Sequence, residues 1–166
     1  MSSKLQIAIF GGAECDAQVG DLAYATGEAL AHAGAVLVCG GRGGVMAAAC
    51  QGAHDAGGVT LGVLPGIDAQ DSTPNPALSH VVYTGMGQAR NLAVVLSSAA
   101  AIAIGGGWGT LSEIALALKH QIPVVTLASW TLDRPDGRAE PLLEHAATAG
   151  QAVELALDMA RRERLG

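Results

Sequence analysis

Short runs of apolar residues alternate with longer amphipathic stretches along most of the chain. A short apolar run bounded by glycine or polar residues is typical of a strand buried on both faces of a parallel sheet. These runs predict strands at residues 5–10, 35–39, 59–64, 81–84, 99–104 and 123–127. The longer stretches predict helices at residues 17–33, 45–56, 88–96 and 110–120, and a last helix that ends near Arg164.

Local signals support two of the helix boundaries and identify two long loops. Gly34 follows the helix predicted at 17–33, where glycine commonly ends a helix in the left-handed conformation. Thr148 and Gln151 have the spacing of a capping box at the start of the last helix. Residues 65–77 are rich in Pro, Asp, Ser and Asn and predict a functional or mobile loop, and the polar stretch 130–141 predicts a surface connection.

The alternation of strands and helices predicts an α/β fold. Because crossovers between parallel strands are right-handed, we expect a single-domain, Rossmann-like, doubly wound sheet of six or seven mainly parallel strands with helices on both faces. A length of 166 residues suits one domain that spans 1–166. In such sheets ligands bind beyond the carboxyl ends of the strands, where the strand order reverses.

Glycine changes this picture, because its 23 residues are about twice the usual share and are clustered. Three clusters follow predicted strands, and a glycine-rich turn before a helix lets backbone N–H groups approach an anion. A cluster can also be only a tight turn, but three at one sheet edge favour a phosphate site. The glycines concerned are Gly11, Gly12, Gly40, Gly41, Gly43, Gly44, Gly105, Gly106, Gly107 and Gly109.

Composition and spacing exclude several classes of function. The net charge of −6, with nine basic residues, argues against a nucleic-acid polymer as partner. No signal peptide and no membrane-spanning run is recognisable, which predicts a cytoplasmic protein without a membrane partner. The three cysteines and the scattered histidines lack metal-ligand spacing, so we expect no metal site. The glycine loops match neither a Walker loop nor a dinucleotide fingerprint.

Arg90 and Asn91 begin the helix after the fourth strand, at the expected ligand edge. A guanidinium there can bind a phosphate in a bidentate manner, and Asn91 can bind a ligand or cap the turn. An arginine with a solvent or carboxylate partner is the other interpretation of Arg90.

Thr110, Glu113 and Trp108 allow two interpretations each. Thr110 and Glu113 have capping-box spacing, which alone would explain both. A carboxylate one turn behind a phosphate loop could also face a sugar or base, or act in cleavage of a glycosidic bond. Trp108 could stack on a heterocycle or pack over the sheet edge.

Two segments resemble a known family. Gly106-Gly107-Trp108-Gly109-Thr110-Leu111-Ser112-Glu113 resembles the P-G-G-x-G-T-x-x-E motif of the LOG (Lonely Guy) family, long misannotated as lysine decarboxylases. Residues 40–46, which end with Met46, are similar to that family's earlier glycine loop. The resemblance covers residues 6–123 and implies the Rossmann-like fold.

The resemblance implies two functions that differ in kind. LOG enzymes are phosphoribohydrolases that cleave the N-glycosidic bond of nucleoside 5′-monophosphates, with catalytic residues that would correspond to Arg90 and Glu113. This sequence has Gly105 where the motif has proline and Asn91 where lysine is usual. Both departures resemble a sister branch that includes the molybdenum cofactor carrier proteins, which bind and protect a phosphorylated pterin.

We therefore expect a small phosphorylated ligand, with molybdenum cofactor as the leading candidate and a nucleoside monophosphate as the second. Neither would be required for folding. Hydrolysis of nucleoside monophosphates is the alternative function, lysine decarboxylation is not expected, and a Rossmann-like subunit without a ligand is the third hypothesis. Apolar helix surfaces at 94–96 and 114–118, together with the resemblance, predict a homodimer or homotetramer.

Overall fold

The computed structural model describes residues 4–163. They form one sheet of seven strands, in the order β4-β3-β2-β1-β5-β6-β7, and every neighbouring pair is parallel. The elements are β1 Gln6–Phe10, α1 Ala17–His32, β2 Val36–Cys39, α2 Val45–Asp55, β3 Val59–Leu64, β4 His80–Tyr83, the 3-10 turn η1 Gly87–Ala89, α3 Arg90–Leu96, β5 Ala100–Ile104, α4 Trp108–Lys119, β6 Val124–Leu127, β7 Leu143–Ala146 and α5 Ala149–Glu163.

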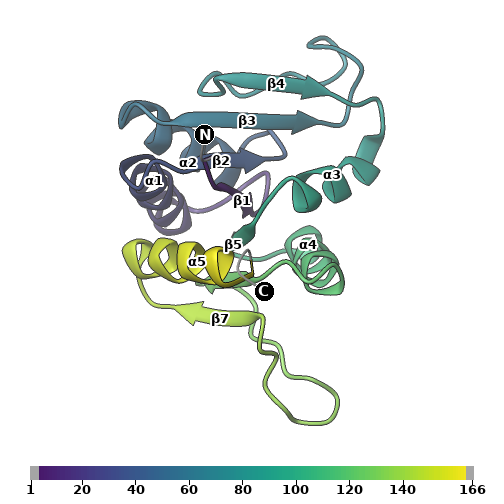
Figure 1. Ribbon diagram of the computed structural model, residues 1–166. Helices are drawn as coiled ribbons and strands as arrows, with labels where there is room; N and C mark the ends of the chain where they lie inside the picture. The colour runs from purple at the N-terminus through teal and green to yellow at the C-terminus, as the bar shows by residue number, and fades with distance from the viewer. Residues whose placement is uncertain (1–3, 164–166) are drawn as a thin grey trace.

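Helices cover both faces of the sheet (Figure 1). Alternate residues of β1 separate the two layers, because successive side chains of a strand point to opposite faces. Ile7 and Ile9 join the core cluster formed with α1, α2 and α5. Ala8 and Phe10 join the cluster formed with α3 and α4. The predicted doubly wound α/β sheet is thereby confirmed.

The strand order reverses between β1 and β5. From β1 the chain adds β2, β3 and β4 on one side, and it then adds β5, β6 and β7 on the other. Ile7 aligns with Leu37 of β2 on one side and with Ala100 of β5 on the other. The loops that leave β1 and β5 therefore diverge to opposite faces, and a crevice opens between them at the carboxyl edge.

The structure corrects the predicted elements at two places. The sequence pattern assigned no strand to Leu143–Ala146, because β7 is a four-residue edge strand whose Glu144 and His145 are exposed. Helix α4 begins at Trp108, two residues before the predicted start, because extended Gly107 precedes it. The predicted end of the last helix, near Arg164, lies outside the described residues.

The start of α5 follows the predicted capping pattern with one shift. The backbone N–H of Gln151 donates to Thr148 Oγ1 at 3.2 Å, as a capping residue requires. The Gln151 side chain accepts a hydrogen bond from the N–H of Ala147, at 2.8 Å, rather than from Thr148. Unpaired donors at the helix start are satisfied in both cases.

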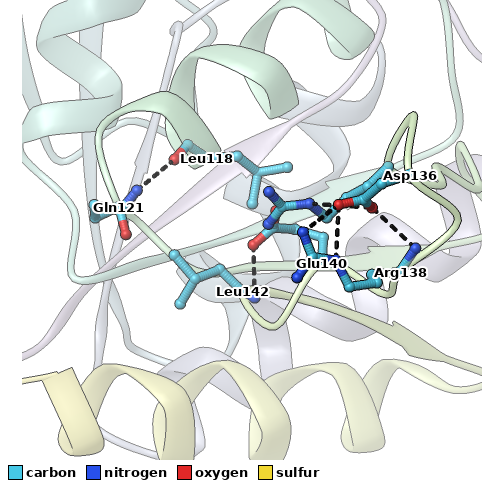
Figure 2. A network of polar contacts seen from close by, with 7 residues as sticks. Leu118, Gln121, Asp136, Arg138, Glu140 and Leu142 are labelled. Atoms are coloured by element: carbon cyan, nitrogen blue, oxygen red, sulfur yellow. Dashed lines mark hydrogen bonds and ion pairs between the residues drawn. The ribbon is translucent and has the colours of Figure 1, made fainter.

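The connection between β6 and β7 is an ordered polar loop that projects beyond the sheet (Figure 1). Arg138 donates from Nε to a carboxylate oxygen of Asp136 at 2.7 Å, and Arg134 pairs with Glu140 at 3.4 Å. Figure 2 shows Arg138 pointing toward Asp136, and the N–H of Leu142 donating to Glu140. The side chains of these pairs are partly or largely exposed, so solvent screens the charges and the pairs contribute little to stability.

Within residues 4–163, every helix is too short or too polar to cross a lipid bilayer. The apolar surfaces expected to support an oligomer are only partly exposed. Ile114 and Ala117 are buried against the sheet, whereas Leu96 remains 55% exposed at the end of α3. The oligomeric state stays a prediction.

Candidate functional site

A cavity of about 620 Å³ lies at the carboxyl edge of the sheet, at the reversal of strand order. This volume falls within the range of roughly 300–1,000 Å³ that is usual for small-molecule sites. The cavity wall combines residues from the loops after β1, β2, β3 and β5 with η1 and the first residues of three helices. The lining residues are Gly11, Gly12, Ala13, Arg42, Met46, Pro65, Gly87, Gln88, Arg90, Asn91, Gly107, Gly109, Thr110 and Glu113.

Most of the residues predicted from the sequence converge in this wall. The loops at 40–44 and 105–110 contribute to one cavity, although sixty residues of sequence lie between them. The predicted residues in the wall are Gly11, Gly12, Met46, Arg90, Asn91, Gly107, Gly109, Thr110 and Glu113. That they bind a ligand stays a prediction.

Other predicted residues lie outside the wall. Gly105 and Gly106 line a neighbouring hollow of about 280 Å³, and the ring of Trp108 lies beside that of Trp130 instead of in the cavity wall. The glycines of the second loop lie behind the wall and position Arg42, which does reach it. They are Gly40, Gly41, Gly43 and Gly44.

Gly40 is required by the position of Arg90. A Cβ atom at residue 40 would lie 2.6–2.7 Å from the terminal guanidinium atoms of Arg90, closer than side chains pack. The absence of a side chain therefore allows the guanidinium to rest against the backbone of the second glycine loop. Gly40 does not line the cavity, but the space it leaves sets the position of Arg90, which does.

Arg90 is a buried cation with unused hydrogen-bonding capacity. The residue is 8% exposed, its Nη1 donates to the side-chain oxygen of Asn91, and its buried Nε has no partner. Burial lowers the pKa of Arg90 from its ordinary value, and nearby Glu113 opposes this shift. A buried guanidinium without a full set of acceptors is the group that an anionic oxygen would satisfy.

Glu113 faces the same cavity from α4 and forms no ion pair with Arg90. Burial raises the pKa of Glu113 to about 7, while the charge of Arg90 acts in the opposite direction. Near neutral pH the carboxyl is therefore partly protonated, and the two arginines of the wall, Arg42 and Arg90, dominate its charge. This balance favours an anion in the cavity of a protein that is acidic as a whole.

The predicted capping box at Thr110 and Glu113 is wrong. Gly107 occupies the N-cap position of α4 and no side chain caps the helix. Thr110 therefore lies inside the first turn, 2% exposed, and its Oγ1 has no hydrogen-bond partner. The first N–H groups of α4 also lack intrahelical acceptors, so the cavity wall offers several free donors at a helix N-terminus.

A Thr110→Val substitution should separate binding from stability. Valine has nearly the shape of threonine and removes only a hydroxyl that contributes no protein hydrogen bond. We expect the free energy of unfolding to change by less than about 1 kcal/mol, while affinity for a phosphate-bearing ligand falls about five-fold or more. Chemical denaturation and calorimetric titration measure the two effects. A variant with unchanged affinity would show that this hydroxyl does not bind the ligand.

Sequence reasoning missed several lining residues. Arg42 is the charged residue of the predicted glycine loop at 40–44, and that charge is a signal by which the sequence could have marked it as a candidate. Pro65 and Gln88 carried no comparable signal, because their place in the wall depends on how the β3 loop and η1 fold together. The loop after β3 and η1 are joined by a hydrogen bond in which the N–H of Gly87 donates to the carbonyl of Pro65 at 3.0 Å.

Comparison with known proteins identifies the family. The model of the SLOG cluster4 family matches residues 4–159. The chain belongs to this family. An uncharacterized protein from Archaeoglobus fulgidus is 43% identical over 123 residues, which cover 74% of this chain and 80% of that protein.

Two solved structures extend the SLOG comparison. The molybdenum cofactor binding protein from the phototrophic bacterium Rippkaea orientalis is 36% identical, with a TM-score of 0.84 over 96% of this chain and 99% of that one. The molybdenum cofactor carrier protein from Chlamydomonas reinhardtii is 34% identical, with a TM-score of 0.83 and the same coverage. The expected LOG-like membership, close to the carrier branch, is thereby confirmed.

Proposed function

We propose that this protein binds molybdenum cofactor and acts as a carrier of it. The observation that carries the proposal is the cavity at the strand reversal, where Arg42, Arg90 and the N-terminus of α4 converge. The comparisons support the proposal as well, because two similar structures that align over nearly their whole length are molybdenum cofactor binding and carrier proteins.

The residues of the wall fit the phosphate group of such a ligand. Arg90 Nε and Thr110 Oγ1 are buried polar atoms without protein partners, and both would donate to phosphate oxygens. Arg42 is exposed and would add charge at the cavity mouth. Among the described residues, no thiol or imidazole lines the cavity, so the wall would hold the ligand through its phosphate, and the redox chemistry would be that of the bound cofactor.

Hydrolysis of nucleoside monophosphates is the alternative function, and the similar structures favour it less, since they are molybdenum cofactor binding and carrier proteins. With a pKa of about 7, the Glu113 carboxyl is partly neutral near neutral pH, so it would stabilise an oxocarbenium-like centre less than a fully ionised carboxylate does, although it could still act as a general base. The same neutral carboxyl is compatible with binding, because it adds no negative charge beside the phosphate. We therefore assign Glu113 a binding role.

Anaerobic incubation with molybdenum cofactor, followed by gel filtration, tests the proposal. We expect the cofactor to co-elute with the protein, measured as molybdenum and as pterin fluorescence after oxidation. AMP incubated with the same preparation should yield no free adenine by chromatography. Release of adenine without retention of cofactor would favour the hydrolase instead.

Affinity should fall as Glu113 ionises. Burial raises the pKa of this carboxyl from 4.5 to about 7, so its negative charge appears mainly above neutral pH and repels a phosphate dianion. Between about pH 6 and pH 8 we expect wild-type affinity to fall as much as ten-fold relative to Glu113→Gln, which stays neutral. The ratio of the two dissociation constants cancels the ionisation of the phosphate itself. A ratio independent of pH would contradict the assigned role.

The same shift has a consequence for stability. Because the folded state holds the Glu113 proton more tightly than the unfolded state, this residue should lower the free energy of unfolding as pH rises from about 4.5 to about 7. Denaturant titrations across that range should show a smaller decline for Glu113→Gln than for wild type. An identical decline in both proteins would show that Glu113 is not the group responsible.

A further inference from the structure

Trp108 is a large aromatic residue that folding leaves in water. It is the first residue of α4, and 79% of it is exposed. Its ring lies beside that of Trp130, with 5.5 Å between the ring centroids and 36° between the planes. These are the two tryptophans of the chain, and one precedes β6 in the sequence while the other follows it.

Trp130 holds a fixed position in this pair. Its Nε1 donates to the carbonyl oxygen of Gly107 at 3.3 Å, and its ring packs partly against the core cluster under α4. A Cβ atom at Gly106 would lie 2.9 Å from Trp130 Nε1, so the glycine turn allows the indole to approach closely. Trp130 is thus anchored to the turn that also lines the cavity, while Trp108 presents its ring to solvent.

A hollow of about 390 Å³ lies against Trp130. Gly106, Ala128, Ser129 and Thr131 form the rest of its lining. Ala128 adopts a left-handed backbone conformation, φ +47°, which costs a non-glycine residue about 1 kcal/mol or more. The Ser129 Oγ is buried and has no hydrogen-bond partner. An aromatic surface beside an unused hydroxyl matches the needs of a planar ring with polar edges.

This hollow and the proposed cofactor site are separate spaces that lie against one turn of backbone. Gly106 lines both the hollow and its neighbour of about 280 Å³, and Gly107 lines that neighbour and the main cavity. The tryptophan pair and the phosphate-binding donors therefore lie on two sides of the turn at 105–109. A ligand with a phosphate at one end and a ring system at the other could contact both.

We propose that Trp108 and Trp130 form a stacking subsite for the fused heterocycle of the ligand whose phosphate occupies the main cavity. This inference rests on the proposed function and assigns the pterin-type ring to the tryptophan pair, outside the cavity itself. Ser129 would hydrogen-bond an edge of the ring. The location explains why an exposed tryptophan stands where helix α4 begins.

Titration with an unphosphorylated pterin tests the subsite separately from the phosphate site. Calorimetry should show pterin binding to wild type, and fluorescence excited at the tryptophan band should be quenched, since both emitters belong to the subsite. We expect Trp108→Ala to weaken pterin binding between about five-fold and one hundred-fold, the usual range for loss of one stacking partner. Inorganic phosphate should bind this variant as it binds wild type.

Three controls make the result specific. Trp108→Phe should keep pterin affinity within about three-fold of wild type, because a stacking ring remains. Leu96→Ala removes another exposed apolar side chain, at the opposite edge of the sheet, and should change nothing. Arg90→Met should show the reverse pattern, with phosphate binding lost and pterin binding kept.

Two outcomes would overturn the inference. Pterin binding that is absent in wild type, or unchanged in Trp108→Ala, would show that the ring does not use this pair. If cofactor still co-elutes with Trp108→Ala at wild-type levels, the proposed function stands, but the ring binds elsewhere. The tryptophan pair would then have another role, such as contact with a protein partner. Failure of wild type itself to retain cofactor would instead contradict the proposed function.

Discussion

Replacing Arg90 with methionine should lower the affinity for molybdenum cofactor, or for inorganic phosphate as a simple probe, by about one hundred-fold or more. Arg90 is buried beside the cavity and has an unpaired Nε. Loss of a desolvated, charge-assisted donor typically costs about 2–5 kcal/mol of binding free energy, which exceeds the effect of any single neutral hydrogen bond in the wall. Methionine retains an apolar stem of similar length, so the cavity wall should remain filled.

The same substitution should leave folding intact or improve it. Burial disfavours the charged form of Arg90, as its lowered pKa indicates, and no ion pair compensates it within the described residues. Replacing a buried charge with an apolar side chain of similar volume is commonly neutral or stabilising. The affinity measured by calorimetric titration should therefore fall, while the free energy of unfolding measured by chemical denaturation should stay the same or rise.

Matched variants make this test decisive. Arg138→Met removes an equal charge from the exposed loop between β6 and β7 and should leave both measurements unchanged. Arg90→Lys keeps the charge but loses the planar fork, and we expect it to recover only part of the affinity. If Arg90→Met bound phosphate within three-fold of wild type, the guanidinium could not be the principal anion-binding group.

The Gly27→Ala substitution in α1 should lower the free energy of unfolding by about 2–3 kcal/mol, although alanine favours helix more than glycine does. Helices α1 and α2 pack so closely that a Cβ at residue 27 would lie 1.8 Å from the carbonyl oxygen of Ala49. On the other helix, Gly52 makes the corresponding contact with the backbone at Tyr24. Accommodating one methyl group requires the two helices to separate along their contact.

Gly20→Ala is the matched control on the same helix. A Cβ at residue 20 would meet only the sulfur of Cys15, at an ordinary 3.7 Å. This variant should stabilise the protein by about 0.5–1 kcal/mol through helix propensity and a less flexible unfolded chain. Urea denaturation of the two variants in parallel measures the difference. Equal stabilities would mean that α1 and α2 tolerate a wider spacing than the structure has.

Separation of α1 from α2 should also affect the site. Helix α2 begins at Val45, whose N–H donates to the carbonyl of Gly12 at 3.0 Å and so joins the first two glycine loops. Because Arg42 and Met46 flank this junction, we expect Gly27→Ala to weaken phosphate binding modestly, by a few-fold. The stability effect remains the larger one.

Patterns along the chain predicted the fold with few errors. Fully apolar runs such as Ala100–Ile104 leave a buried parallel strand as the main choice, and all five of its residues are buried. The error at Leu143–Ala146 has a physical cause, since an edge strand with two exposed positions lacks that pattern. Helix α4 begins at Trp108 instead of the predicted Thr110, because Gly107, in an extended conformation, is the N-cap residue.

The sequence by itself determined the α/β sheet and the grouping of glycine loops at its carboxyl edge, because hydrophobic period and glycine position are local properties of the chain. It also predicted Arg90 and Glu113 as residues of the ligand site, and both line the cavity. Only the tertiary structure decided that Arg90 rests on Gly40, that Glu113 is buried enough to titrate near 7, and that Trp108 pairs with Trp130 outside the cavity. These properties depend on contacts between segments far apart in sequence, which no local pattern encodes.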